Sequence, residues 1–243
     1  MALKRQKGSE LLCRICPVSQ RSLCGALTRG LGQVPEQCPY PVRQSPYNAE
    51  ANEIIYSREA ISGDVFAVCQ GWALRFVELI DGRRQNLGVL LPGDISFAGL
   101  FEDKLHYSVQ AVTKLRITRF ARADLMKRIL GDAHTLELYG KACAAQLRDV
   151  EERAVDLGRR SAEERVSRLI LGLVDRISEH RILPDHPYPF PLLQRHIADL
   201  TGLTSVHVSR VMTEFRNAGL IRLTKRSLMI TNLSGLEQIG CLH

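Results

Sequence analysis

The segment QRHIADLTGLTSVHVSRV, residues 194–211, constrains the fold more strongly than any other part of the chain. Ala198 provides a small residue where two helices can cross, and Gly202 provides a turn between them. Thr201 fits less well, because an apolar residue is usual there. Apolar residues occupy the positions that would face inward, namely Ile197, Leu203, Val208 and Val211. The segment therefore predicts a helix-turn-helix.

The residues after this turn predict a second helix and a wing. The helix is expected over residues 205–217, with Thr204 as its N-cap. Residues 220–223 and 228–230 then flank a polar turn, which is typical of a two-stranded antiparallel ribbon. The C-terminal region is thus predicted to be a winged helix-turn-helix.

The outer face of the second helix has the chemistry of a DNA-binding surface. From residue 205 to 226 there are five Lys or Arg residues and one acidic residue, in a chain of net charge +7. Arg210 can donate two hydrogen bonds to guanine, Ser209 can bond a base or a phosphate, and Val206 can contact a thymine methyl group. The wing residues Lys225 and Arg226 would hold phosphates without reading sequence. The predicted DNA-binding residues are Thr204, Ser205, Val206, His207, Ser209, Arg210, Lys225 and Arg226. The alternative is an ordinary helical domain with a solvated basic face.

The rest of the chain divides into three predicted segments by its patterning. Residues 1–52 contain cysteines and prolines and read as an arm. Residues 53–121 contain short apolar runs between turns, including Asp81-Gly82, and predict a compact β domain. Residues 122–158 predict one long helix, and residues 159–243 the winged domain, opened by a Ser161–Glu164 capping box. The predicted fold class is α+β.

The proline-free segment 122–158 also shows a heptad pattern. The pattern predicts a parallel coiled coil between two copies of the chain, although a single amphipathic helix packed on its own domain is the alternative. Seven residues recur at alternating spacings of four and three, namely Leu136, Gly140, Cys143, Leu147, Val150, Ala154 and Leu157. The predicted dimer interface comprises Leu136, Cys143, Leu147, Val150 and Leu157.

Taken together, the β domain, the long helix and the winged helix resemble the Crp/Fnr superfamily of transcription regulators, and the Fnr and FixK branches in particular. The most specific matches are LGRRSAEER (157–165), IADLTGLT (197–204) and VSR (208–210). The resemblance implies a cyclic-nucleotide-binding-like β-roll and a homodimer that binds a two-fold operator in double-stranded DNA. RNA polymerase would be a further partner of an activator.

Two departures from the family pattern limit what the resemblance implies. Nucleotide-binding relatives have an arginine before a serine that holds the cyclic phosphate, whereas here Tyr107 precedes Ser108. Cyclic AMP is therefore not expected as the effector, because the phosphodiester would lack its guanidinium partner. The family often has a glutamate where this chain has Val206, which predicts a different operator half-site.

Three of the seven cysteines, Cys13, Cys16 and Cys24, lie within twelve residues of one another. They are candidate ligands of an iron–sulfur cluster, and zinc is the alternative metal. The other two interpretations are that they are redox thiols or that they bind no ligand. Oxygen-sensing Fnr-like proteins place a fourth cysteine late in the β-roll, where this chain has Arg116. Cys38 is then the candidate fourth ligand.

The sequence also predicts where the protein acts and what it does not do. The N-terminus lacks the apolar stretch of a signal peptide, and no long apolar run is free of breakers, so we expect a cytoplasmic protein that does not enter the membrane. No phosphate loop, nucleophile elbow or HExxH motif is present, which argues against an enzyme. The alternative function is a metal- or redox-sensing protein without specific DNA binding.

Overall fold

The computed structural model describes residue 24 and residues 44–61, 64–178 and 181–241. The chain forms two compact units, one of residues up to 75 with 89–146, the other of residues 76–88 with 147–243.

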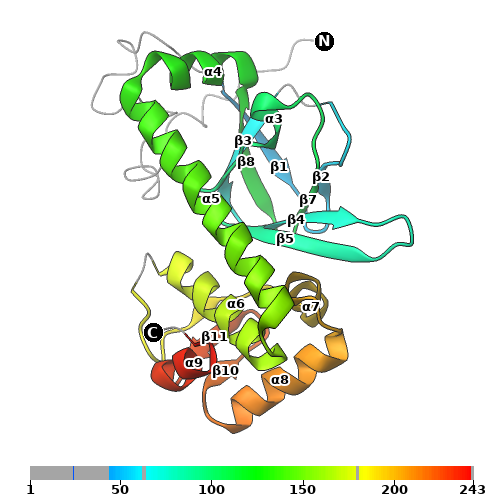
Figure 1. Cartoon of the computed structure of the whole chain (residues 1–243), viewed down its shortest axis with the longest axis vertical. Helices are drawn as coiled ribbons and strands as arrows, with labels where there is room; N and C mark the ends of the chain where they lie inside the picture. The colour runs from blue at the N-terminus through cyan, green and yellow to red at the C-terminus, as the bar shows by residue number, and fades with distance from the viewer. Residues whose placement is uncertain (1–23, 25–43, 62–63, 179–180, 242–243) are drawn as a thin grey trace. The chain divides into compact units, whose positions relative to one another are not determined.

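The N-terminal region is built on two four-stranded sheets, ordered β1-β8-β3-β6 and β2-β7-β4-β5 (Figure 1). The strands are β1 (Gln44–Ala49), β2 (Ile54–Tyr56), β3 (Asp64–Gln70), β4 (Ala73–Glu78), β5 (Arg84–Leu90), β6 (Ile95–Ser96), β7 (Ser108–Ala111) and β8 (Leu115–Ala121). Gly82 has φ +82° in the turn between β4 and β5, as the Asp81-Gly82 pair predicts. The predicted β-rich fold of this region is confirmed.

The structure corrects the prediction that residues 1–52 form an arm. Residues 44–49 form β1, which pairs along its whole length with β8. The prolines around this strand suggested irregular chain, but Pro46 lies in an edge strand, where a missing backbone N–H is tolerated.

A hydrophobic cluster joins the first sheet to the helices beside it (Figure 1). Val65 and Ala67 point to one face of β3 and pack with Phe120 of β8. The cluster also includes Leu100 of α3 (Ala98–Phe101) and Leu125 of α4 (Arg122–Gly131). The alternate residues of β3 point to the other face, where Phe66 stacks on Tyr56 with ring centroids 4.9 Å apart. Alternation along β3 therefore separates a helix-facing core from the interior of the β-roll.

The long helix predicted over residues 122–158 is in fact two helices. α4 ends at Gly131, and α5 runs from Ala133 to Arg159. Asp132 between them has extended backbone, and its carboxylate accepts a hydrogen bond from the Thr135 N–H at 3.1 Å. A proline-free run is not necessarily a continuous helix, because aspartate is a strong N-cap that stabilises a new start.

The C-terminal region is a winged helix with a third strand. The capping box at Ser161 and Glu164 is present at the start of α6. A short strand, β9 (Tyr188–Pro189), pairs with the second strand of the wing and extends it to a three-stranded sheet, ordered β10-β11-β9. The elements are α6 (Ala162–Ile177), β9 (Tyr188–Pro189), α7 (Gln194–Thr201), α8 (Ser205–Asn217), β10 (Ile221–Leu223), β11 (Ser227–Ile230) and α9 (Leu233–Ile239). Among the described helices, none combines the length and the apolar composition needed to span a bilayer.

Candidate nucleic-acid interface

The turn between α7 and α8 follows from the predicted residues. Gly202 ends α7 in the left-handed conformation, with φ +66° and ψ 30°. Ala198 and Ile197 are buried. Thr201 is also buried, and its hydroxyl donates to the Ile197 carbonyl at 2.7 Å. A threonine is tolerated at this usually apolar position because its one polar atom is satisfied within the helix.

The start of α8 is fixed by a cap and by its buried face. The Thr204 hydroxyl accepts a hydrogen bond from the His207 N–H at 3.2 Å, which confirms the predicted N-cap. The helix buries Val208, Val211, Met212 and Phe215. Val206 is 81% exposed, and Arg210 is also exposed. The predicted outward residues therefore lie on the solvent side of α8.

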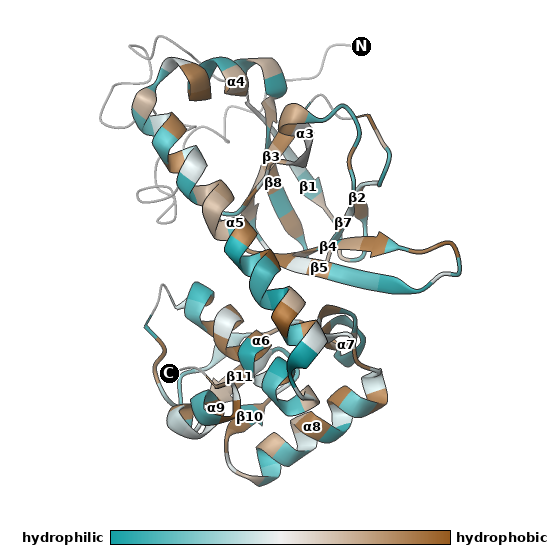
Figure 2. Cartoon of the chain, viewed as in Figure 1, coloured by the Kyte–Doolittle hydropathy of each residue, from teal (hydrophilic) through white to brown (hydrophobic). Residues whose placement is uncertain are grey.

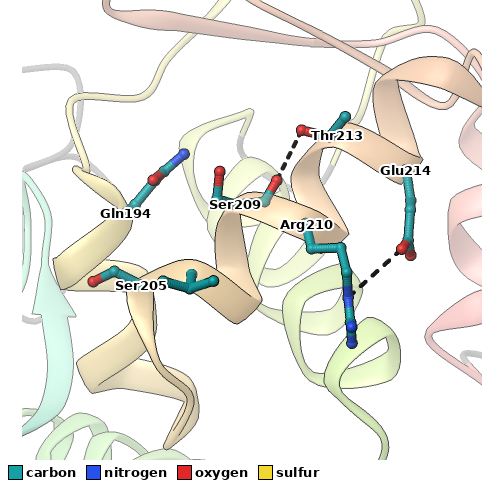
Figure 3. Close-up of a pocket in the computed structure, with 7 residues that line it drawn as sticks. Gln194, Ser205, Ser209, Arg210, Thr213 and Glu214 are labelled. Carbon is teal, nitrogen blue, oxygen red and sulfur yellow. Dashed lines mark hydrogen bonds and ion pairs between the residues drawn. The ribbon is translucent and has the colours of Figure 1, made fainter.

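Figure 3 shows an open hollow along this outer face of α8. It is lined by Gln194, Ser205, Val206, Ser209, Arg210, Thr213 and Glu214. The DNA-binding residues predicted from the sequence do not include Gln194, Thr213 or Glu214. Thr213 could have been found from spacing, because residues 205, 209 and 213 are four apart and share one helix face. Its hydroxyl donates to the Ser209 carbonyl at 2.8 Å.

Arg210 lies between two side chains of its own helix. Its Nη2 is 2.8 Å from Nε2 of His207, and its Nε is 3.8 Å from a carboxylate oxygen of Glu214. In Figure 3 a dashed line joins Nε of Arg210 to the Glu214 carboxylate, and the terminal nitrogens of the guanidinium extend beyond that contact. Both partners of this ion pair are more than half exposed, so it stabilises the fold little.

A second carboxylate, that of Glu163 in the first turn of α6, interacts electrostatically with Arg210 and His207. The pKa of Glu163 is lowered, first by a backbone N–H and then by the Ser161 hydroxyl. The nearby side chains of Arg210 and His207 lower it further by smaller amounts. Arg210, an exposed basic residue of the predicted recognition surface, is thus accompanied by two acidic groups, Glu214 and Glu163.

The predicted phosphate-binding residues lie at the tip of the wing. Lys225 and Arg226 are exposed in the turn between β10 and β11. The turn is held by the Thr224 N–H, which donates to the Ser227 carbonyl at 2.9 Å. The Arg226 carbonyl also accepts a bond from the Phe190 N–H at 2.8 Å, so β9 supports the wing.

Ion pairs connect the last turns of α5 to α6. Arg168 of α6 lies 3.0 Å from Asp156 and 2.5 Å from Glu152, both on α5. Arg160 pairs with the same two carboxylates. The Arg168 guanidinium is only 14% exposed, so this network is better shielded from solvent than an isolated surface pair.

The predicted dimer residues form an uncovered apolar stripe on α5. Leu136 is 45% exposed, Leu147 60%, Val150 61% and Leu157 41%. Hydrophobic segments recur along the helix in Figure 2. Cys143 is half-buried, and it is hydrogen-bonded to Tyr139, whose pKa is raised by burial first and by this bond second. Within α5 only Thr135 is fully buried, so no element in the described part of the chain covers these apolar side chains completely.

Tyr107, which stands where nucleotide-binding relatives have an arginine, lies in the interior of the β-roll. This side chain is 3% exposed, and its hydroxyl lies 2.7 Å from the Ser96 hydroxyl. The Arg75 guanidinium lies 5.4 Å from the Tyr107 ring centroid. The position at which nucleotide-binding relatives have an arginine is therefore filled here by an internally bonded tyrosine.

The predicted metal ligands are only partly described by the structure. Cys13, Cys16 and Cys38 lie outside the described residues. Cys24 is half-buried and packs against the hydrophobic cluster beside Phe97, Met126 and Tyr139. Arg116 lies in β8, paired with Asn48 and Gln70 on its two sides. Within the described part of the chain, no three His, Cys, Asp or Glu side chains are grouped closely enough to hold a metal.

Comparisons with known proteins agree with this architecture. A model of the cyclic nucleotide-binding domain matches residues 47–131, and a model of the Crp-like helix-turn-helix domain matches residues 164–239. The nitrogen fixation regulation protein FixK of Bradyrhizobium diazoefficiens is 27% identical over 94% of this chain and 93% of its own. The transcriptional activatory protein AadR of Rhodopseudomonas palustris is 28% identical over 85% of this chain and 83% of its own.

A solved structure supports the same assignment. FixK2 from Bradyrhizobium japonicum superposes with a TM-score of 0.72 at 26% identity, over 81% of this chain and 97% of that one. The relatives are regulators rather than enzymes, as the sequence predicts. With both of its domains matched, the chain belongs to the Crp/Fnr superfamily of DNA-binding transcription regulators.

Proposed function

We propose that the protein binds a two-fold operator as a homodimer, with α8 of each copy in the major groove of successive half-sites. The observation that supports this most directly is the uncovered stripe of Leu136, Leu147, Val150 and Leu157 on α5. Apolar side chains in a heptad pattern are stabilised when a second helix covers them. A parallel pairing gives two-fold symmetry, which an operator with half-sites one helical turn apart would match.

The proposal assigns base contacts to α8 and phosphate contacts to the wing. Arg210 has the exposure and the donors to bind guanine, and Ser205, Val206 and Ser209 lie on the same outer face. Thr204 and His207 shape the start of the helix. Lys225 and Arg226 are exposed in the wing turn, and their role in the proposal is to bind phosphates. The protein acts in the cytoplasm, with RNA polymerase as its partner where it activates.

Arg210→Ala is expected to weaken operator binding by about 1–3 kcal/mol and to relax the preference at a single base pair. The cause is the loss of a two-bond contact with guanine. The measurement is a competition assay in which each base pair of the half-site is varied in turn.

Lys225→Ala is the matched control on the wing. It should weaken binding equally for all sequences and reduce the salt dependence of the affinity, because it removes only a phosphate contact. If Arg210→Ala also weakened all sequences equally, Arg210 would contact phosphate and the base contact would be refuted.

Val206 is expected to change the preferred half-site relative to family members with glutamate at this position. A glutamate accepts a hydrogen bond from cytosine, whereas the 81% exposed valine offers only a methyl surface. Selection from random DNA should therefore return a half-site that differs at this base pair. Val206→Glu should restore the cytosine preference, and recovery of the same half-site by both proteins would contradict the assignment.

We further propose that the N-terminal cysteines sense oxygen or redox state through an iron–sulfur cluster. Cys13, Cys16 and Cys24 supply three thiols in one segment, and clusters are held by such thiolates, commonly four. A guanidinium cannot ligate iron, so Arg116 leaves the fourth position to Cys38. Cys24 packs among apolar side chains, an environment that limits the access of water to a bound cluster.

Protein purified without oxygen is expected to contain iron and acid-labile sulfide, and Cys24→Ser should lose both. Cys241→Ser is the control, because this exposed cysteine lies beside Glu164 near the other end of the chain. Metal-free, colourless protein that still binds its operator would refute the cluster. Zinc without sulfide would instead identify a structural metal site.

The effector is not proposed to be a cyclic nucleotide. Tyr107 fills the interior of the β-roll at the position of the phosphate-binding arginine, and its hydroxyl is already bonded to Ser96. A bound phosphodiester would have to displace this bond without gaining a guanidinium partner.

A further inference from the structure

His207 is a residue of α8 whose side-chain contact points to a role of its own. Its Nε2 lies 2.8 Å from Nη2 of Arg210, one helical turn further along α8. A guanidinium has only donors, so the histidine nitrogen must be the acceptor in this bond. The ring is therefore neutral in this arrangement, with its proton on Nδ1.

Arg210 has a second contact, with Glu214. The Glu214 carboxylate is 3.8 Å from Nε of Arg210. Counted from Arg210, Glu214 is four residues later on α8 and His207 three residues earlier. The two partners hold the long side chain along the helix and leave the remaining donors on Nη1 and Nη2 for another acceptor. Guanine O6 and N7 accept two hydrogen bonds from such a group.

We propose that His207 is a positioning residue, which as a neutral acceptor orients the Arg210 guanidinium and thereby sets the guanine preference of the operator half-site. It makes no base contact in this role. The inference rests on the proposed function, in which Arg210 contacts a base. A freely rotating arginine would instead bind phosphates on either strand, and those contacts contain no sequence information.

The test compares His207→Gln with His207→Phe. Glutamine retains an acceptor oxygen on a side chain of similar reach, whereas phenylalanine retains the ring shape without an acceptor. Neither change removes the Thr204 cap, which binds the backbone N–H of residue 207. The measurement is the affinity ratio between operator duplexes that differ only at the base pair identified by Arg210→Ala.

His207→Phe is expected to reduce this affinity ratio about tenfold, as for the loss of one hydrogen bond to a charged group. His207→Gln should retain the ratio, because its amide oxygen can accept the same bond from Arg210.

The outcomes separate this inference from the proposed function. If Arg210→Ala leaves the base preference unchanged, the base contact itself is refuted. If Arg210→Ala relaxes the preference while His207→Phe leaves it intact, the positioning role of His207 is overturned and the base contact stands.

Discussion

Replacing Leu147 and Val150 together with glutamate is expected to convert the protein from a dimer to a monomer at micromolar concentration. Both side chains are about 60% exposed in the single chain, with values of 60% and 61%, and both belong to the heptad pattern. Covering a leucine or valine fully contributes about 1.5–3 kcal/mol. Because the interface is two-fold, the double substitution removes four apolar side chains from it, two in each copy. We therefore expect the dissociation constant of the dimer to rise by at least about a thousandfold.

The added carboxylates make the effect larger, because four like charges would meet at the seam. Operator affinity should fall with dimerisation, since a monomer engages only one half-site. Light scattering measures the mass, and binding to one or two half-sites measures the consequence. Val155→Glu is the matched control, because Val155 is 45% exposed on α5 but lies off the heptad pattern. A monomeric native protein at micromolar concentration would refute the dimer.

The elements that the sequence predicted best are those with local causes. Thr204 and Ser161 cap helices with their own hydroxyls, and Gly202 adopts a conformation that few other residues tolerate. These interactions involve residues close in the chain. The start and end of α8 therefore match the residues predicted from the sequence.

The features that the sequence did not predict have three different causes. Pro46 indicated irregular structure, but its strand is stabilised by β8, which begins far later in the chain. The break at Asp132 was missed because a single capping residue interrupts an otherwise helical pattern. The contacts of Arg210 with His207 and Glu214 depend on side-chain torsions, which spacing alone does not determine.

Gly71→Ala is expected to destabilise the β-roll by about 3–5 kcal/mol, since two costs add at this position. Gly71 has φ +89° in the turn between β3 and β4, a conformation that alanine rarely adopts. An added Cβ would also lie 2.2 Å from the Lys114 carbonyl oxygen and 2.9 Å from the Thr113 hydroxyl.

The neighbouring backbone cannot move away without breaking other bonds. The Thr113 hydroxyl accepts from the Trp72 N–H at 3.0 Å, and the Trp72 carbonyl accepts from the Val112 N–H at 2.8 Å. These bonds join the turn after β3 to the turn after β7. Trp72 is the only tryptophan of the chain and is buried, so its fluorescence reports urea unfolding at this site.

Gly82→Ala separates the two costs. Gly82 has nearly the same φ, +82°, but an added Cβ would meet no atom within 4 Å. Alanine there should cost only about 1 kcal/mol, from backbone conformation alone. The free energy of unfolding falls by about 1–3 kcal/mol for each molar of urea. The Gly71 variant should therefore unfold at a clearly lower urea concentration than the Gly82 variant. Equal losses would mean that the Lys114 carbonyl yields to the new methyl group, and that the contact between the two turns contributes little to the stability of the β-roll.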